Sequence, residues 1–191
     1  MAPLSFFIAS ATLGLVSSAL AQCGSAADAT VDGTEGAYTA SAGGAEVYSG
    51  SDYLAAIQAA IDSISSGQTV AVIASGSIGA NTISIDSGKT FEGCGTINVG
   101  YNAGHGAIEV LDAADVSIPY LSMTGDPYFG LRFYGTSGLN LGEIDMQLSA
   151  GLGIRFERDE AANTDVTMGT ITVSPPTIKN RPHHTANTRC L

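Results

Sequence analysis

A three-residue pattern recurs along this chain at a fixed interval. Ile108-Glu109-Val110 is followed by Leu131-Arg132-Phe133 and then by Ile154-Arg155-Phe156, a step of 23 residues each time (131 − 108 and 154 − 131). Two further triplets follow each of these, at 116–118 and 121–123, 139–141 and 144–146, and 166–168 and 171–173. A period in the twenties with three short strands in each repeat is typical of a solenoid built from stacked β-rungs.

The same alternation of apolar and polar residues runs through all nine triplets. The first and third residue of each triplet is apolar and the central residue is polar. We therefore expect the flanking side chains to stack into a core, and the central ones to form outward ladders about 4.8 Å apart. Strands are also predicted at 69–73 and 83–85. Phe91 and Ile97 are expected to lie one rung before Val116 and Leu121.

The predicted rungs are preceded by two segments of different character. Residues 1–21 resemble a secretory signal, with a short apolar run that ends in the small residues Ala19-Leu20-Ala21. Residues 22–50 are rich in Ala, Gly, Ser and Thr, and we expect an irregular N-terminal arm there. Residues 51–66 have a helical apolar stripe that begins at a Ser51 or Asp52 cap, so this helix is expected to cover the open end of the first rung.

The end of the chain breaks the pattern. Residues 174–191 have no periodicity, and they hold three of the seven basic residues. This composition is unsuited to closing a solenoid. We expect either a disordered tail or non-native sequence on a truncated, inactive N-terminal fragment that lacks later rungs.

The predicted architecture resembles a known superfamily. The tight two-residue turns at 119–120, 142–143 and 169–170, the helix in front, and the stretch 82–100 with its Lys89-Thr90 and Gly93-x-Gly95 are similar to early rungs of pectate lyases and polygalacturonases. The resemblance covers residues 51–173. It implies an all-β fold: a single-stranded, right-handed parallel β-helix of the pectin lyase-like superfamily, with about four rungs and three strands in each, from a secreted fungal protein.

The resemblance implies a substrate groove along the sheet of first strands. Its outward residues are Glu109, Arg132 and Arg155 in successive rungs. Glu109 can pair with one arginine, which leaves Arg155 to hold a carboxylate of a uronic-acid polymer. Tyr128 could stack on a sugar, and Arg158 lies in the adjoining loop. The alternative is an ion-pair ladder that only covers an exposed sheet.

Candidates for catalysis are weaker. Asp126 and Asp159 are predicted to flank the groove as the paired carboxylates of a glycoside hydrolase, although acidic residues are also ordinary in turns. A lyase would instead need a base and neutralisation of the substrate carboxylate by arginine or Ca²⁺. No Asp cluster has calcium-like spacing, and His105 is expected to be a turn residue because the sequence motifs around the polygalacturonase histidine are missing.

Charge and cysteine content restrict the partners. The net charge of −11 and pI near 4.3 disfavour nucleic acid and anionic membranes. No apolar run is long enough to span a bilayer, and no Cys/His cluster has metal-ligand spacing. In a secreted chain Cys23 and Cys94 could form a disulfide, although Cys190 makes the count odd. The sequence thus predicts an extracellular protein that cleaves or only binds a pectin-like polysaccharide.

Overall fold

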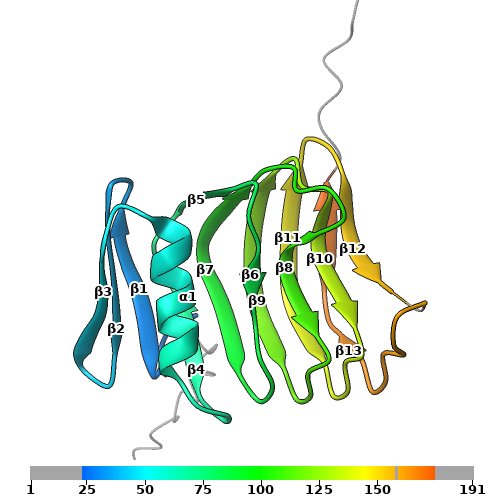
Figure 1. Cartoon of the computed structure of the whole chain (residues 1–191), viewed down its shortest axis with the longest axis horizontal. Helices are drawn as coiled ribbons and strands as arrows, with labels where there is room; N and C mark the ends of the chain where they lie inside the picture. Colours follow the sequence, from blue (N-terminus) through cyan, green and yellow to red (C-terminus); the bar gives the residue numbers. More distant parts are fainter. Residues whose placement is uncertain (1–22, 158, 175–191) are drawn as a thin grey trace, which may run out of the picture.

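The computed structural model describes residues 23–157 and 159–174. The predicted signal segment 1–21, Arg158, and the predicted tail beyond Ser174 lie outside the described residues. The chain forms a mostly β structure, a parallel β-solenoid of about five turns with one short helix at its N-terminal end (Figure 1). The predicted fold class is confirmed, with about one more turn than the sequence pattern indicated. The described helix falls short of the length and apolarity needed to cross a membrane.

Two parallel sheets form the walls of the solenoid. The smaller sheet has four strands in the order β12-β10-β8-β6, and the larger has ten strands and continues into the N-terminal region. The bounds of the small-sheet strands are β6 (Ile83–Ser84), β8 (Gly106–Leu111), β10 (Phe129–Tyr134) and β12 (Leu152–Phe156). Those of the large-sheet strands within the solenoid are β4 (Thr69–Val72), β5 (Gly76–Gly79), β7 (Thr90–Val99), β9 (Ser117–Gly125), β11 (Asn140–Leu148), β13 (Thr167–Met168) and β14 (Ile171–Ser174).

The predicted two-residue turns at 119–120 and 142–143 are wrong in detail. β9 and β11 pass through these positions as single bent strands, and Glu143 still pairs with Tyr120. The bend is possible because Gly142 lies against the preceding rung, where an added Cβ would come within 2.3 Å of the carbonyl oxygen of Pro119. The two segments are separate strands in the first turn, as β4 and β5, and in the last described rung, as β13 and β14.

The early register also differs from the prediction. Ile97 pairs with Met123 rather than Leu121, because the register shifts between Gly93 and Thr96. Gly95 lies within this irregular stretch at a point where a Cβ would be 2.2 Å from the carbonyl oxygen of Ala74. Such a close approach of two backbones requires glycine.

Most of the segment predicted as an irregular arm, residues 22–50, is regular structure. Residues 29–50 form an antiparallel meander of β1 (Ala29–Thr34), β2 (Ala37–Ala42) and β3 (Ala45–Gly50). β1 also pairs in parallel with β4, so the meander extends the large sheet beyond the solenoid. The sequence signal was weak because, apart from Val31, the inward positions are small or aromatic rather than branched: Ala29, Tyr38 and Ala40.

The predicted capping helix is confirmed as α1 (Tyr53–Ser63), slightly shorter than 51–66. Asp52 is its N-cap, and its carboxylate accepts a hydrogen bond from the backbone N–H of Ala55 at 3.0 Å. Tyr53, Ala56, Ile57, Ala60 and Ile61 form the buried stripe, which packs on the meander and the first rung. At the other end the buried Lys89 donates to the carbonyl of Ile61 at 3.0 Å, which ties the helix to the second rung.

The core is the stack of inward side chains predicted from the triplets. All flanking residues of the triplets between 108 and 146 are buried, among them Ile108, Leu131, Phe133, Leu141 and Met146 with 0% exposure. The flanking residues of the last rung are only partly buried or exposed. Burial of a triplet therefore depends on having a rung on both sides of it.

Candidate functional site

The small sheet places the three predicted charged residues in one ladder. Glu109 pairs with Arg132 and Arg132 with Arg155 across β8, β10 and β12, as the spacing predicted. The ladder is not a simple stack of like charges, however. Glu157, which follows directly after β12, reaches back to both arginines, and the sequence pattern did not single it out.

Two carboxylates and two guanidinium groups therefore alternate on this face. Arg132 donates from Nη1 to Glu109 Oε1 at 3.2 Å and from Nε to Glu157 Oε1 at 3.4 Å. Arg155 donates from Nη2 to Glu157 Oε2 at 2.9 Å. The prediction that Arg155 has no partner within the protein is wrong, because the loop after β12 turns Glu157 toward it.

The pKa shifts reflect these ion pairs. Burial disfavours the charge on Arg132, but hydrogen bonds to Glu109 and Glu157 outweigh it and raise the pKa of its guanidinium. The hydrogen bond to Glu157 likewise raises the pKa of Arg155, with a smaller contribution from the charge of Asp159. In return the bond from Arg155, followed by that from Arg132, lowers the pKa of Glu157.

Glu109 is the more deeply buried of the two carboxylates in these ion pairs. It is only 6% exposed, and besides Arg132 it accepts a 2.8 Å hydrogen bond from the backbone N–H of Gly106. His105 lies beside it, with Nδ1 3.4 Å from Glu109 Oε1. His105 follows the turn before β8, as expected from sequence, and its side chain covers the carboxylate. The Glu109 carboxylate is therefore occupied by partners within the protein.

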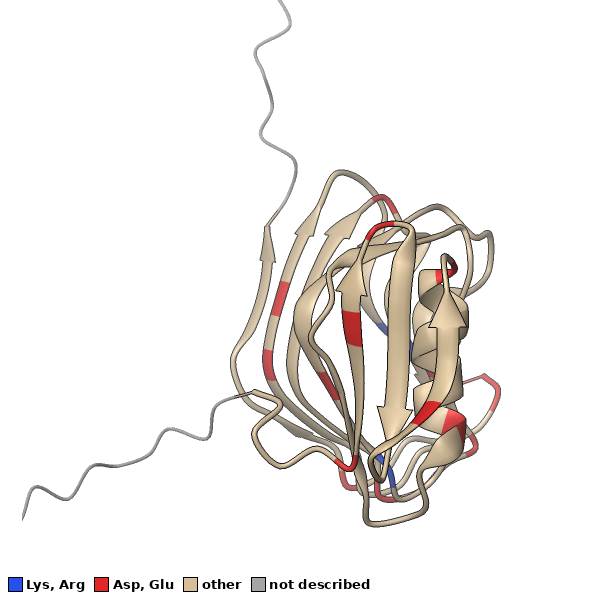
Figure 2. Cartoon of the chain, turned by 90° about the vertical axis from the view of Figure 1, so that its left-hand side faces the viewer, with Lys and Arg blue, Asp and Glu red and all other residues tan. Residues whose placement is uncertain are grey.

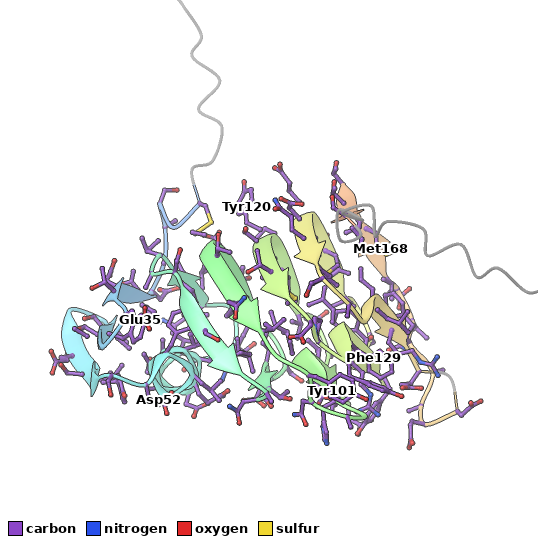
Figure 3. All side chains as sticks on the ribbon, turned by 90° about the horizontal axis from the view of Figure 1, so that it is seen from above. Glu35, Asp52, Tyr101, Tyr120, Phe129 and Met168 are labelled. Carbon is purple, nitrogen blue, oxygen red and sulfur yellow. A yellow bond between two sulfur atoms is a disulfide. The ribbon has the colours of Figure 1, made fainter. Side chains whose placement is uncertain are left out.

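An aromatic group adjoins the ion pairs, on the side of the molecule opposite Tyr120 (Figure 3). The exposed rings of Tyr101 and Tyr128 meet edge to face with centroids 5.5 Å apart, and Tyr128 meets Phe129 at 4.5 Å. The Arg155 guanidinium lies 5.8 Å from the Phe129 centroid. Leu152, paired with Phe129 in the sheet, is 57% exposed. We call Tyr101, Tyr128, Phe129, Leu152 and Arg155 the tyrosine face.

Sequence analysis found part of this surface. Tyr128 was predicted to contact a sugar, and its exposed position leaves that prediction open. Tyr101 was missed because it lies in the irregular loop between β7 and β8, outside every triplet. Its position 27 residues before Tyr128 (128 − 101), close to the rung period, was the available signal.

The two aspartates proposed for catalysis are both exposed. Asp126 lies in the turn before β10, where its backbone N–H donates to Val99, and Asp159 lies in the loop after β12 near Arg155. Among the described residues, the carboxylates brought together by arginine are instead Glu109 and Glu157. Arg158 lies outside the described residues, so its assignment to substrate binding stays a prediction.

The predicted disulfide is present. Cys23 and Cys94 are bonded, which ties the segment before β1 to the outer surface of β7. Glu92 lies close by and accepts a 2.6 Å hydrogen bond from the backbone N–H of Gly24. Among residues 23–157 and 159–174, Cys23, Glu92 and Cys94 are the one group of three side chains close enough to share a metal ion. The disulfide occupies both sulfurs, so this group does not provide thiolate ligands.

Charge on the described surface is strongly one-sided. All eighteen acidic residues are described, but only Lys89, Arg132 and Arg155 of the basic ones. Acidic positions dominate the view in Figure 2 accordingly. Each of the three cations is in an ion pair, Lys89 with Asp86 and the two arginines with glutamates.

Comparison with known proteins adds no relative: no family model, no curated protein and no solved structure matches the chain. What the structure establishes is a parallel β-solenoid of about five turns.

Proposed function

We propose that this protein binds polysaccharide outside the cell without cleaving it, and that the tyrosine face holds the sugar chain. The observation that carries this proposal is the pair of exposed rings, Tyr101 and Tyr128, set edge to face, with Tyr128 in contact with the Phe129 ring that adjoins the guanidinium of Arg155. Sugar rings present C–H groups that pack on aromatic side chains, and hydroxyl groups that accept from a guanidinium.

The arrangement is suited to a linear chain. Parallel strands place equivalent residues of successive rungs about 4.8 Å apart, so one extended polymer can run across β8, β10 and β12. Tyr101 lies in the loop between β7 and β8, and Tyr128 lies in the equivalent loop of the next rung, between β9 and β10, so the two rings are adjacent beside this path. In the pectin lyase-like superfamily, which this chain resembles in architecture, the corresponding sheet is where the substrate groove lies.

The charges favour an uncharged chain over a polyuronide. Glu109 and Glu157 balance Arg132 and Arg155, and the nearby loops add Asp126 and Asp159 without a described free cation. A polyanion approaching this face would therefore meet a net negative field. A neutral polymer of glucose, xylose or mannose meets no such repulsion.

The same ion pairs argue against cleavage. Hydrolysis needs one protonated and one ionised carboxyl group on either side of the sugar bond. Glu109 is buried under Arg132 and His105, while the arginines hold the pKa of Glu157 below its ordinary value of 4.5. Glu157 is therefore not prepared to donate a proton near neutral pH, and Glu109 is enclosed by its partners within the protein.

An extracellular setting is consistent with the covalent structure. The Cys23–Cys94 disulfide is typical of proteins that fold in an oxidising compartment. It lies immediately after the predicted signal segment, so cleavage near Gln22 would leave Cys23 at the start of the mature chain.

Binding can be tested with the secreted, disulfide-bonded protein and a panel of soluble polymers: a β-glucan, a xylan, a mannan and polygalacturonate. We expect at least one neutral polymer to bind more tightly than polygalacturonate. Tyr128→Ala should weaken that binding by about tenfold, as truncation of an aromatic anchor commonly does. Arg155→Ala should weaken it by a smaller factor. Tyr120→Ala, on the opposite side of the molecule, is the matched control.

Two results would contradict the proposal. One is the failure of every polymer to bind, or equal binding by Tyr128→Ala and the unaltered protein. The other is product formation, detected as absorbance at about 235 nm for a lyase or as new reducing ends for a hydrolase, which would make the protein an enzyme.

A further inference from the structure

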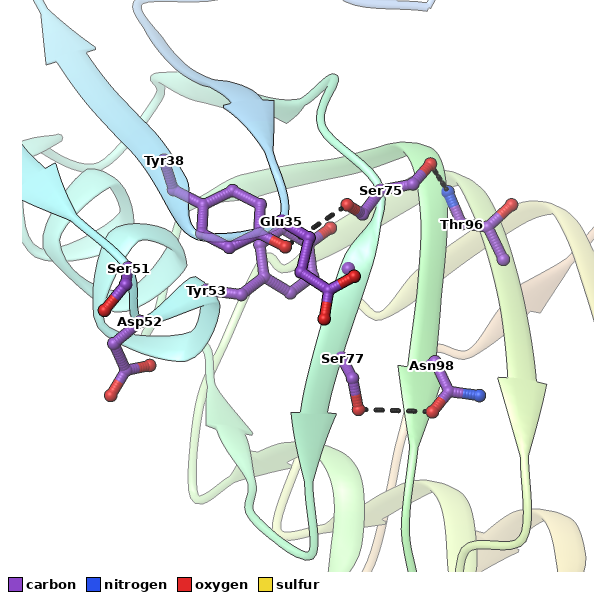
Figure 4. A pocket seen from close by; sticks show the side chains of 10 residues that line it. Glu35, Tyr38, Ser51, Asp52, Tyr53, Ser75, Ser77, Thr96 and Asn98 are labelled. Carbon is purple, nitrogen blue, oxygen red and sulfur yellow. Dashed lines mark hydrogen bonds between the residues drawn. The ribbon is translucent and has the colours of Figure 1, made fainter.

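A cavity lies at the N-terminal end of the large sheet, away from the tyrosine face. It has a volume of about 570 Å³ and opens where the meander and the start of α1 meet β5 and β7. Figure 4 shows Tyr38 and Tyr53 behind it, Glu35 over it, and Ser77 and Asn98 along its floor. None of these residues was singled out in the sequence or used in the proposed function.

Two buried tyrosines make the rear wall rigid. Tyr38 and Tyr53 are 3% and 2% exposed, and their ring centroids are 4.7 Å apart. Tyr53 donates to the carbonyl of Ala74 at 2.7 Å, and burial raises the pKa values of both phenols, so both stay neutral. Gly76 permits this packing, because a Cβ there would lie 2.5 Å from the Tyr38 oxygen.

The cavity lining has carboxylates but no basic residue. Glu35, in the turn between β1 and β2, is exposed, and its side chain extends over the opening toward Ser77 (Figure 4). Asp52 uses one carboxylate oxygen to cap α1, which leaves the other for a ligand. The described cations, Lys89, Arg132 and Arg155, are all outside this lining. The cavity therefore favours a ligand with positive charge.

A row of polar side chains leads out of the cavity along the solenoid. Ser77 donates to Asn98 at 3.1 Å, and Asn98 donates to Thr124 at 3.2 Å. Gln147 and Ser174 continue the row in register on β11 and β14. A parallel row beside it contains Thr96 and Ser122, joined at 3.3 Å, followed by Asp145 and Thr172. We call these two rows the polar ladder.

We propose that the cavity and the polar ladder bind a linear polysaccharide of amino sugars that carry free, protonated amines. Glu35 and Asp52 attract the ammonium groups of the sugars that enter the cavity, while the hydroxyl and amide groups of the ladder bind the ring hydroxyls of the following sugars. The ladder advances about 4.8 Å with each rung, close to the length of one sugar in an extended chain.

The test is calorimetric titration at mildly acidic pH with two tetramers of the same linkage, β-1,4-linked glucosamine with free amines and its fully N-acetylated, uncharged form. We expect the free-amine tetramer to bind about tenfold more tightly. Raising the ionic strength from about 0.01 M to about 0.15 M should weaken its binding, because the Debye length falls from about 30 Å to about 8 Å.

Two charge-removing substitutions locate the site. Glu35→Gln and Asp52→Asn should each weaken binding of the free-amine tetramer by about threefold to fivefold, and asparagine preserves the N-cap. Glu46→Gln removes an exposed carboxylate of β3 that is outside the cavity lining and should leave binding unchanged.

Equal affinity for the two tetramers, or unchanged binding by the Glu35→Gln/Asp52→Asn double variant, would overturn the proposal. So would a lysine tetramer that binds as tightly as the amino sugar, because charge alone would then explain the affinity. The site does not depend on the tyrosine face. Tyr128→Ala should leave it intact, so each proposal can fail without the other.

Discussion

The two ends of the solenoid differ in how the last layer of apolar side chains is covered. At the N-terminal end, α1 and the meander pack over the first rung, and Val70, Ile83 and Ile57 are almost completely buried. At the other end of the described chain, Met168 pairs with the buried Leu141 and Val173 with the buried Met146, yet Met168 is 54% exposed and Val173 is 47% exposed.

The same triplet pattern thus has opposite environments at the two ends. A cavity of about 450 Å³ opens beside the last rung, and Phe156, Val166 and Met168 line part of it. In a solenoid each rung is buried by its neighbours, so an apolar residue is no better buried than the layer next to it. The contribution of one triplet to stability therefore depends on its place in the stack, and substitutions at equivalent positions measure this directly.

The largest effect on stability is expected from truncating one of two phenylalanines that lie in adjacent rungs. Phe133 is completely buried, whereas Phe156, its partner in the sheet, is only partly buried. Phe133→Ala should lower the free energy of unfolding by about 3–5 kcal/mol, and Phe156→Ala by about 1–2 kcal/mol, because less apolar area is lost. Urea denaturation measures both. Equal losses would mean that the end beside Phe156 is covered in solution.

Loss of the disulfide, near the N-terminal end of the solenoid, should have the next largest effect on stability. Cys23 and Cys94 are 71 residues apart, so the bond removes much of the freedom of the unfolded chain. Cys23→Ser/Cys94→Ser should lower the free energy of unfolding by about 2–4 kcal/mol. Dithiothreitol should destabilise the unaltered protein similarly and leave the double variant unaffected. A melting temperature of the unaltered protein that does not respond to the reductant would contradict this.

The smallest effect on stability is expected at Glu157, in the last described rung. Its pKa is lowered in the folded state by Arg155 and Arg132, so its stabilising contribution is present above the ordinary value of 4.5 and is lost as pH falls through the lowered folded pKa. As the pH is lowered below 4.5, the melting temperature should therefore fall less steeply for Glu157→Gln than for the unaltered protein.

The matched control for this pH dependence is Glu160→Gln, which removes a nearby exposed carboxylate. We expect the melting temperature of Glu160→Gln to fall with acidification as steeply as that of the unaltered protein. If the melting temperature of Glu157→Gln falls just as steeply, the ion pairs with the two arginines do not contribute to stability in solution.

Much of the fold followed from residue type and spacing. Ile108, Leu131 and Ile154 lie in register as the repeat predicted, and the Glu109–Arg132–Arg155 ladder follows from the same alternation. Asp52 was one of two predicted caps. The meander was missed because its inward positions, such as Ala29 and Ala40, have little apolar bulk, and because its stability comes from pairing with β4, which is 41 residues away for Ala29 and Val70 (70 − 29).

The candidate sites were less predictable than the fold. The partners of Arg132 and Arg155 depend on Glu157, which lies two positions beyond Arg155 and reaches it only because β12 ends there. The cavity between the meander, α1 and β5 brings together Glu35, Asp52 and Asn98 from three separate segments. Such groupings depend on how loops fold back on the sheet, and the periodicity contains no information about that.

By itself the sequence determined the repeating unit: which residues face inward, which face outward, and that one helix precedes the stack. These properties are local, because they depend on the two-residue period of a strand and on the cap and apolar stripe of a helix. Only the tertiary structure decided which triplets are truly buried, which charges neutralise one another, and where the cavities open. Those properties depend largely on contacts between residues more than twenty positions apart, such as those of Arg132 with Glu109 and Glu157, and each is set by the rung or loop that packs alongside.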